Sequence, residues 1–299
     1  MDKKYFGQIK LGLIQRGVTI PTMLQGLAEV SRGLCSAEPG EEITLALAED
    51  FIVKTFLNPP DKDGPKLISQ QDQLRLLMEE GEADVSIISV PEFLKQQLKK
   101  RTPVSENICL DGYCFNVFLR AMGRGKKLSM PIEATLSVIQ AAFEEGAADL
   151  VQLNMDYSND DDRGFPRLAP LVEAIKKRFN TFVALKGFPP ADKRIIDLVY
   201  ASGFDIVNFP LGGFYGTVKS KKIMGAEKIY EALEYASSIF SPGTVWTDLA
   251  MSPGSQGRFK EGIDRLTDSG IIPLILLQRD SVAEGSTYQN LVELADHMD

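Results

Sequence analysis

Two cysteines five positions apart, Cys109 and Cys114, stand in the stretch NICLDGYCFN, residues 107–116. The whole chain has three cysteines, and Cys35 is the third. Cysteine thiolates hold iron–sulfur clusters and zinc, but such sites usually take three or four of them. The pair therefore indicates a metal-binding loop that is short of ligands. The open alternative is two small buried apolar residues, which is the common state of free cysteine.

A second group of chemically capable residues stands at the ends of short apolar runs. Its members are Glu49, Asp50, Glu92, Asn154, Asp156, Tyr157, Lys186, Asn208 and Asp248. In a barrel of parallel strands the active site lies at the carboxyl ends, where the following loops converge. Polar groups that point into such a mouth need a partner, water or a ligand. The pattern predicts a small polar ligand there, although each residue alone could also cap a strand or a turn.

Eight apolar, β-branched runs predict strands that are buried on both faces, as in a parallel sheet. The runs are residues 43–48, 84–90, 107–109, 149–154, 181–186, 205–209, 244–249 and 271–277. Segments with apolar residues at three- and four-residue steps predict helices between them, at residues 69–81, 132–146, 168–179, 191–203, 225–237 and 257–270. Several of these segments end in glycine, which favours the left-handed conformation after a helix.

Strands that alternate with helices predict a parallel (β/α)8 TIM-type barrel, full or nearly closed. We assign the barrel domain to residues 41–299 and an N-terminal helical extension to residues 1–40. The proline-glycine stretch 58–65 and the acidic run 156–162 are interpreted as loops within the barrel.

Composition narrows the classes of function. The net charge of -8 disfavours a nucleic-acid surface, and the one basic cluster, Arg120, Arg124, Lys126 and Lys127, is either a solvated loop or a dock for a small anion. No apolar run is long enough to span a membrane. No secretory signal is evident, so we expect a cytoplasmic protein without a disulfide framework. The single histidine, His297, leaves none for acid–base catalysis or a typical zinc site.

From about residue 107 to residue 277 the chain resembles the radical S-adenosylmethionine barrels, most closely the biotin synthase-like branch. The stretches that carry the resemblance are NICLDGYCF, GAADLVQLNMDYSNDDDRGFP, TFVALKGFPP, GFDIVNFPLGGFYG and FKEGIDRLTDSGIIPLILL. The resemblance implies Cys109 and Cys114 as metal ligands. It further implies S-adenosylmethionine as a candidate cofactor, bound by Cys109, Asp111, Cys114, Asn154, Tyr157 and Asn208.

The sequence departs from that family at its cluster motif, CxxxCxxC, whose three thiolates leave one iron open. If Cys109 is the first ligand, Tyr113 and Asn116 occupy the other two places. If Cys114 is the last, Asn107 and Asp111 do. Amide, phenol and carboxylate groups do not usually replace thiolates on such clusters. The departure implies either a lost [4Fe-4S] cluster or one completed by a ligand from elsewhere.

Two hypotheses follow, and whether the chain is an enzyme stays open between them. The first is a radical S-adenosylmethionine-like barrel without its standard cluster, which binds a small molecule or partners an active radical enzyme in cofactor or metabolite biosynthesis. A radical enzyme with an unusual set of cluster ligands is a variant of it. The second hypothesis is a cluster-free barrel lyase or aldolase.

In the second hypothesis Lys186 forms a Schiff base with a carbonyl substrate, and Asp156 or Asp248 is its acid–base partner. Glycines of two loops, Gly212, Gly213, Gly216, Gly254 and Gly257, would let backbone amides approach a phosphate. The first hypothesis is our main prediction from the sequence, and the second is its alternative.

Overall fold

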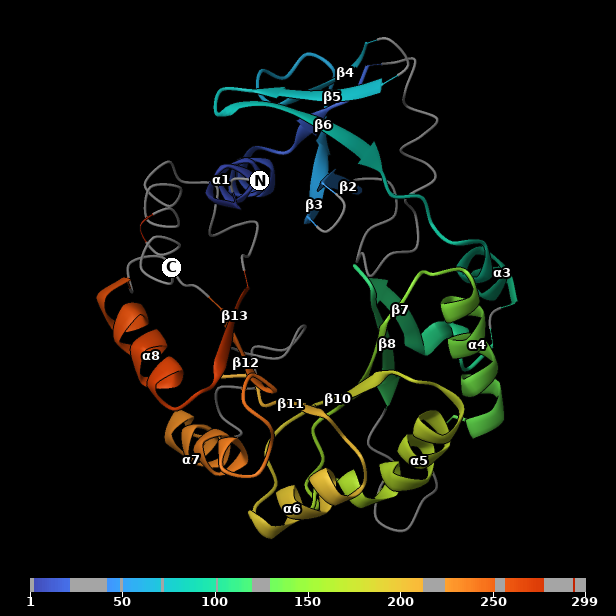
Figure 1. The fold of residues 1–299 in the computed structure, drawn as a ribbon, viewed down its shortest axis with the longest axis vertical. Coiled ribbons are helices and arrows are strands. Elements are labelled where there is room, and N and C mark those ends of the chain that lie inside the picture. Colours follow the sequence, from blue (N-terminus) through green and yellow to red (C-terminus); the bar gives the residue numbers. More distant parts are fainter. Residues whose placement is uncertain are drawn as a thin grey trace. The chain divides into compact units, whose positions relative to one another are not determined.

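A computed structural model describes residues 3–21, 42–48, 51–70, 73–100, 102–119, 130–211, 224–250, 256–276 and 293 of the chain. The chain divides into two compact units. The first comprises residues 1–90, 252–256 and 277–299, and the second comprises residues 91–251 and 257–276 (Figure 1). We describe each unit by itself.

The first unit contains a small closed barrel and one helix, α1 (Lys3–Arg16). Its strands are β1 (Val18–Thr19), β2 (Glu42–Ala48), β3 (Phe51–Asn58), β4 (Lys66–Gln70), β5 (Gln73–Met78) and β6 (Gly81–Ile87), in the order β1-β3-β2-β6-β5-β4. Strand β1 runs parallel to β3 and β4, and the other pairs are antiparallel. Ile9 and Leu13 of α1 join the buried core of this barrel.

The structure corrects the sequence prediction in this unit. Residues 43–48 and 84–90 were expected to be parallel strands, but β2 and β6 are antiparallel neighbours. Residues 69–81 were expected to form a helix, but they contribute to β4, β5 and the start of β6. In β5 Leu74 and Leu76 are two positions apart, and Leu76 is fully buried. Gly81 has a φ of 144° where the β5–β6 hairpin pairs it with Met78, so it serves a hairpin and not a helix end.

The second unit is built on one curved sheet in the order β13-β12-β11-β10-β9-β8-β7. The strands are β7 (Ile108–Asp111), β8 (Cys114–Leu119), β9 (Leu150–Met155), β10 (Phe182–Lys186), β11 (Ile206–Asn208), β12 (Val245–Ala250) and β13 (Ile272–Leu276). Strands β8 to β13 are parallel, and β7 pairs antiparallel with β8. The sheet is therefore an open half-barrel.

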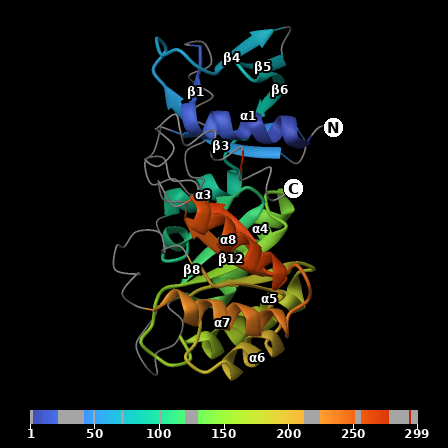
Figure 2. The ribbon, with the colours of Figure 1, turned by 90° about the vertical axis from the view of Figure 1, so that its left-hand side faces the viewer.

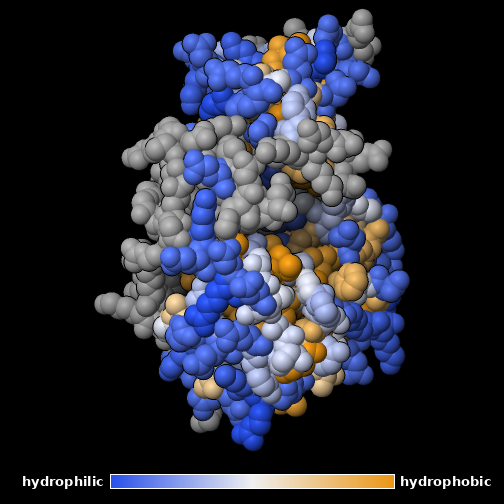
Figure 3. Space-filling model, turned by 60° about the vertical axis from the view of Figure 1, so that its left-hand side comes forward, coloured by the Kyte–Doolittle hydropathy of each residue, from blue (hydrophilic) through white to orange (hydrophobic). Residues whose placement is uncertain are grey.

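Helices cover the convex face of this sheet (Figures 1 and 2). They are α3 (Glu92–Lys100), α4 (Ile132–Glu144), α5 (Ala169–Arg178), α6 (Arg194–Ala201), α7 (Ala226–Ser237) and α8 (Gln256–Asp268), with short 3-10 turns η3 (Ser105–Asn107) and η4 (Phe165–Leu168). Their outer surfaces are charged. Arg265 of α8, for example, bonds Glu227 and Glu234 of α7 at 2.9 and 3.1 Å. Figure 3 shows many hydrophilic residues on one face of the molecule, with apolar residues gathered between them.

Alternate residues of the central strands divide the sheet into two faces. Val151, Leu153, Leu185 and Val207 are fully buried, and each buried side chain of this kind contributes about 1.5–3 kcal/mol. These residues occupy one set of alternate positions, and the helices cover that face. The alternate positions between them lie on the concave face and hold the polar residues Gln152, Asn154, Lys186 and Asn208 together with Ala184 and Ile206. The fold therefore places a group of polar residues on the concave face and an apolar face under the helices.

The prediction of an α/β fold with barrel-like sheets is confirmed, but a full (β/α)8 barrel is wrong. The structure has a closed six-stranded barrel and a separate half-barrel. The predicted strands at residues 149–154, 181–186, 205–209 and 244–249 are confirmed as β9 to β12, and the run 271–277 is confirmed as β13 up to Leu276. The run 107–109 is the antiparallel strand β7. Of the helices in the described residues, none is both long and apolar enough to cross a membrane.

Candidate active site

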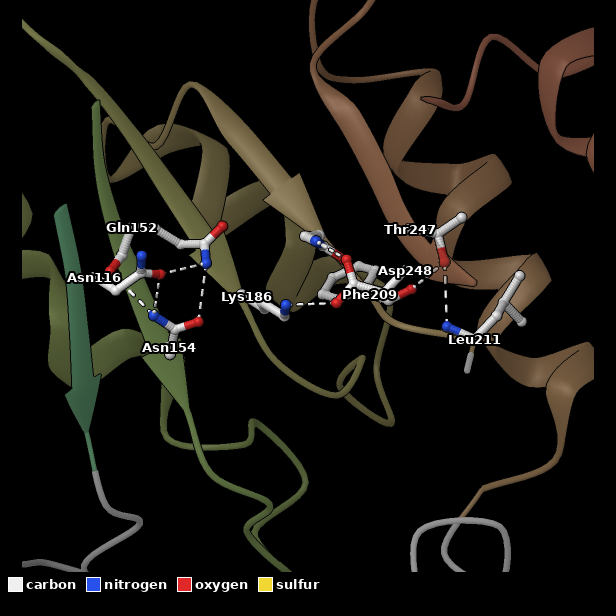
Figure 4. Close-up of polar contacts among 9 residues, drawn as sticks. Asn116, Gln152, Asn154, Lys186, Phe209, Leu211, Thr247 and Asp248 are labelled. Carbon is white, nitrogen blue, oxygen red and sulfur yellow. Dashed lines mark hydrogen bonds and ion pairs between the residues drawn. The ribbon is translucent and has the colours of Figure 1, made fainter. Parts of the chain in front are cut away.

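A buried ion pair lies at the carboxyl ends of the half-barrel strands. Lys186 is the last residue of β10, and its Nζ is 2.5 Å from Oδ2 of Asp248 on β12 (Figure 4). The side chains are 15% and 4% exposed, so little solvent reaches either charge. Strand β11 lies between β10 and β12, and the two side chains meet across it.

Asn208, on the intervening strand β11, bonds the second oxygen of the Asp248 carboxylate. Its Nδ2 donates a hydrogen bond of 2.8 Å to Oδ1 of Asp248. Each carboxylate oxygen of Asp248 thus has its own partner, which fixes the orientation of the group. The Oδ1 of Asn208 is buried and, among the described residues, has no hydrogen-bond donor. Such an unsatisfied buried acceptor costs about 1–3 kcal/mol and needs an explanation.

Three further amides form a group that we call the amide cluster: Asn116 on β8 with Gln152 and Asn154 on β9 (Figure 4). The Nε2 of Gln152 donates to Oδ1 of Asn116 at 2.8 Å and to Oδ1 of Asn154 at 2.9 Å. The Nδ2 of Asn154 donates to the same Asn116 oxygen at 3.0 Å. All three residues are buried.

Strand register places the amide cluster and the ion pair on the same face. Lys186 aligns with Asn154 of β9 on one side and with Asn208 of β11 on the other. Gln152 lies two residues before Asn154 and aligns with Asn116. Aligned residues of neighbouring strands point to the same face, as do residues two apart. Lys186 is therefore flanked by an asparagine on each neighbouring strand.

Four of the residues that the sequence singled out, Asn154, Lys186, Asn208 and Asp248, come together on this face. Gln152 was not singled out, and Asn116 was considered only as an unsuitable cluster ligand. The signal for them was a single polar residue at an alternate position within each of the apolar runs CFNVFL and LVQLNM. An isolated amide in such a run points away from the helix-covered face.

Asp156 and Tyr157 lie beyond the end of β9. Asp156 is exposed, and its backbone N–H donates to the carbonyl of Leu119. The ring of Tyr157 packs edge-on against Phe188, with 5.2 Å between centroids. Of the two carboxylates proposed as partners of Lys186, the one in contact with it is Asp248.

A buried arginine that the sequence analysis missed fixes the same loop. Arg163 is 8% exposed, and its guanidinium donates to the carbonyls of Ser158 at 2.7 Å and Pro189 at 3.1 Å. Its guanidinium carbon lies 4.9 Å from the ring centroid of Tyr157. Its φ of 53° lies in the left-handed region, which costs a non-glycine residue about 1 kcal/mol or more. Arg163 thus ties the loop after β9 to the loop after β10.

The two cysteines of the opening motif lie on the β7–β8 hairpin. Cys109 aligns with Asn116, and Cys114 aligns with Asp111, so the cysteines are not opposite each other. Burial, and then the Asp111 carboxylate, raise the pKa of the Cys114 thiol to about 12, against a smaller opposing effect of Lys186. With no metal bound, a thiol with that pKa is protonated at neutral pH.

Within the described residues no group of three or more histidine, cysteine or acidic side chains could hold a metal ion. The described donor set does not supply the three thiolates of a [4Fe-4S] cluster. We derive no chemistry from one.

Some predicted features fall elsewhere. Glu92 is exposed at the start of α3, where its backbone N–H binds the Glu145 carboxylate at 2.8 Å, and Gly257 lies in α8. Outside the described residues lie Cys35, Glu49, Asp50, Arg120, Arg124, Lys126, Lys127, Gly212, Gly213, Gly216, Gly254 and His297.

Comparisons with known proteins give low similarities. No protein-family model matches the chain, and no curated protein matches it. Among solved structures, the Xanthomonas albilineans dihydropteroate synthase is similar with a TM-score of 0.35 and 16% identity, over 62% of this chain and 65% of that chain. An archaeal fructose 1,6-bisphosphate aldolase is similar with a TM-score of 0.37 and 13% identity, over 69% of this chain and 82% of that one. These similarities assign no activity to this chain.

The predicted resemblance to radical S-adenosylmethionine barrels, and to their biotin synthase-like branch, is wrong. The similar structures named above, a second dihydropteroate synthase from Coxiella burnetii and a chitinase from Pyrococcus furiosus belong to other barrel families. The stretches that suggested the resemblance, such as DLVQLN and DIVNF, are parallel strands of a half-barrel, and that pattern is common to many barrel proteins.

Proposed function

We propose that this chain is a cluster-free lyase or aldolase in which Lys186 forms a Schiff base with a carbonyl substrate. The observation that carries the proposal is the 2.5 Å contact between Lys186 and Asp248 on the concave face of the half-barrel. A lysine attacks a carbonyl only as the neutral amine, so it needs a base beside it. Asp248 lies within direct hydrogen-bonding distance and can take that proton.

The two residues can perform the whole cycle of proton transfers. Asp248 takes a proton from the Lys186 ammonium, and the amine nitrogen then bonds to the carbonyl carbon. A proton moves from this nitrogen to the former carbonyl oxygen. Asp248 returns its proton to the resulting hydroxyl, which leaves as water, so the nitrogen and carbon are joined as an iminium.

The iminium accepts the electron pair of a neighbouring C–C bond when that bond breaks. The proton of the hydroxyl on the departing carbon passes to Asp248, and that carbon leaves as a second carbonyl compound. Asp248 then protonates the remaining enamine carbon, and water releases the product from Lys186. Asn208 holds Oδ1 of Asp248 throughout, so Oδ2 stays directed at Lys186.

A second lysine–aspartate contact in the same unit provides a structural contrast. Lys176 of α5 lies 2.5 Å from Asp205, but these side chains are 31% and 28% exposed. Both also have backbone partners, since Lys176 donates to the Thr181 carbonyl and Asp205 accepts the Val183 N–H. That pair ties a helix to the sheet. The more buried pair of Lys186 and Asp248 is held by the side chain of Asn208 on the concave face. This arrangement suits proton transfer better than it suits the attachment of a helix.

Borohydride trapping tests the proposal. The protein is incubated with small aldehydes and ketones and sodium borohydride, and the intact mass is measured. We expect an increment equal to the reduced substrate adduct in the wild type and in Lys176→Met, and its loss in Lys186→Met. An adduct that persists in Lys186→Met at the wild-type rate would overturn the proposal.

A further inference from the structure

The acceptor Oδ1 of Asn208 has a fixed direction. A carboxylate only accepts hydrogen bonds, so the Nδ2 of Asn208 must face Asp248, and Oδ1 must face the other way. Oδ1 is buried and has no donor among the described residues. It therefore calls for an O–H or N–H group that the described chain does not supply.

That acceptor lies close to the proposed reactive amine. Lys186 and Asn208 align on neighbouring strands and bond the two oxygens of one carboxylate. Neighbouring strands are about 4.8 Å apart, so a molecule of three or four carbons joined to Nζ of Lys186 can reach the Asn208 amide.

The second strand neighbour of Lys186 is also an amide. Asn154 aligns with Lys186 on the opposite side from Asn208 and belongs to the amide cluster. In Figure 4 the Gln152 oxygen points away from Asn116 and Asn154, while its Nε2 makes both bonds within the cluster. A carbonyl carbon at Nζ would therefore have an amide on each side, and amides bond well to hydroxyl groups, which both donate and accept.

Charge around Lys186 is already balanced. At the carboxyl ends of β10 to β12 the described side chains with full charges are Lys186 and Asp248, which pair with each other, and the polar groups bonded beside them are amides. The iminium would keep the same positive charge beside Asp248. A carboxylate or phosphate on the substrate would lose its water without gaining a cationic partner among the described residues of this face, which disfavours a charged substrate.

We infer that the site takes a neutral hydroxy ketone, with hydroxyl groups on the carbons that flank the carbonyl, and that one of these hydroxyls donates to Oδ1 of Asn208. This deepens the proposed function and rests on it. The specificity would come from Asn208 on β11 and Asn154 on β9, and the reaction from Lys186 and Asp248.

The test compares the rate of borohydride trapping for acetone, hydroxyacetone, dihydroxyacetone and pyruvate. Each rate is divided by that of butylamine with the same compound, which removes the intrinsic reactivity of the carbonyl. We expect a two- to tenfold gain for each added hydroxyl, the effect of about one net hydrogen bond. Pyruvate, which carries a carboxylate, should react more slowly than hydroxyacetone.

The same ratios are then measured in Asn208→Leu, which has nearly the same size but no acceptor, and in Asn208→Ser, which keeps a small one. In Asn208→Leu the ratio of dihydroxyacetone to acetone should fall by the two- to tenfold contribution of one hydroxyl, and in Asn208→Ser part of that contribution should be kept. If Asn208→Leu does not fold, the wild-type ratios and the serine variant still decide the question.

Three results are distinguishable. A hydroxyl preference that depends on Asn208 supports the inference. Trapping on Lys186 without that preference, or with pyruvate favoured, overturns the inference but leaves the Schiff base, and then water satisfies Oδ1. No trapping with any carbonyl overturns the proposed function and the inference together.

Discussion

Lys186 and Asp248 contact each other at 2.5 Å although their strands, β10 and β12, are not neighbours in the sheet. The strand between them ends in Asn208, whose amide holds the other oxygen of Asp248. Two strand spacings are about 9.6 Å, which a long lysine side chain and an aspartate on the same face can bridge, and the concave curvature shortens that span. The register that places Lys186 and Asp248 on one face therefore makes the pair possible.

The burial of this pair predicts that loss of Lys186 lowers the free energy of unfolding more than loss of Lys176 does. Removing one partner of a buried ion pair leaves an uncompensated charge and typically costs about 3–5 kcal/mol. We expect Lys186→Met to lower the free energy of unfolding by that amount, as measured by urea denaturation. Lys176→Met removes the more exposed pair and should cost about 1 kcal/mol or less.

The double variant Lys186→Met with Asp248→Leu provides the control. It removes both charges and should recover much of the lost stability, because a buried ion pair is often no better than apolar residues of similar volume. Equal losses in Lys186→Met and Lys176→Met would contradict the burial of the Lys186 pair.

A second prediction concerns Asp248 as the base. Asp248→Asn keeps the size of the side chain but has one acceptor oxygen in place of two and cannot take a proton from Lys186. We expect the rate of adduct formation at neutral pH to fall by about 10²-fold or more, the usual contribution of a positioned general base. Asp156→Asn serves as the matched control and should leave the rate unchanged, since Asp156 is exposed beyond β9. Equal losses in both variants would exclude this assignment.

A third prediction follows from the raised pKa of Cys114. Its thiol should react very slowly with iodoacetamide at pH 7–9, and the rate should increase as the pH approaches 12. The folded pKa lies above the ordinary value of 9.0 for a cysteine thiol, so the unfolded chain loses this proton first. Stability is therefore kept below about pH 9 and falls as the pH rises from 9 toward 12. Rapid alkylation of Cys114 at pH 7.5 in the folded protein would disprove this.

A fourth prediction concerns the loop after β9. Arg163→Leu leaves the carbonyls of Ser158 and Pro189 without their donor and keeps the unfavourable φ of 53°. We expect a loss of about 1–3 kcal/mol and faster limited proteolysis within residues 156–164. Arg194→Leu, at a side chain that is 83% exposed, is the control and should change neither quantity. A stable, protease-resistant Arg163→Leu variant would remove the role assigned to this side chain.

The half-barrel could be predicted from the sequence because its strands are continuous apolar runs between clear helices. Runs such as 149–154 and 181–186 are buried on one face by helices and hold a polar group on the other, which leaves them strongly apolar overall. The small barrel could not be predicted in the same way. In β5 the apolar residues of QLRLLM fit the spacing of a helix as well as that of a strand. The segment is a strand because it pairs with β4 on one side and β6 on the other.

The part of the site that lies within clear strands could be predicted from the sequence. Lys186, Asn208, Asn154 and Asp248 stand in clear strands, so alternation places them on one face. Residues beyond a strand end do not follow that alternation, and accordingly Asp156 is exposed and Tyr157 packs against Phe188. The cysteine motif drew attention to Cys109 and Cys114, so the strand CFNVFL and its buried Asn116 were overlooked.

The most direct test of the account is to locate the trapped adduct along the chain. The wild-type protein is treated with dihydroxyacetone and borohydride, digested, and mapped by tandem mass spectrometry. The account predicts one predominant modified lysine, Lys186, in the peptide that contains LKGFPP. Modification spread over the surface lysines at comparable levels, with Lys186 no more reactive than Lys176, would contradict it.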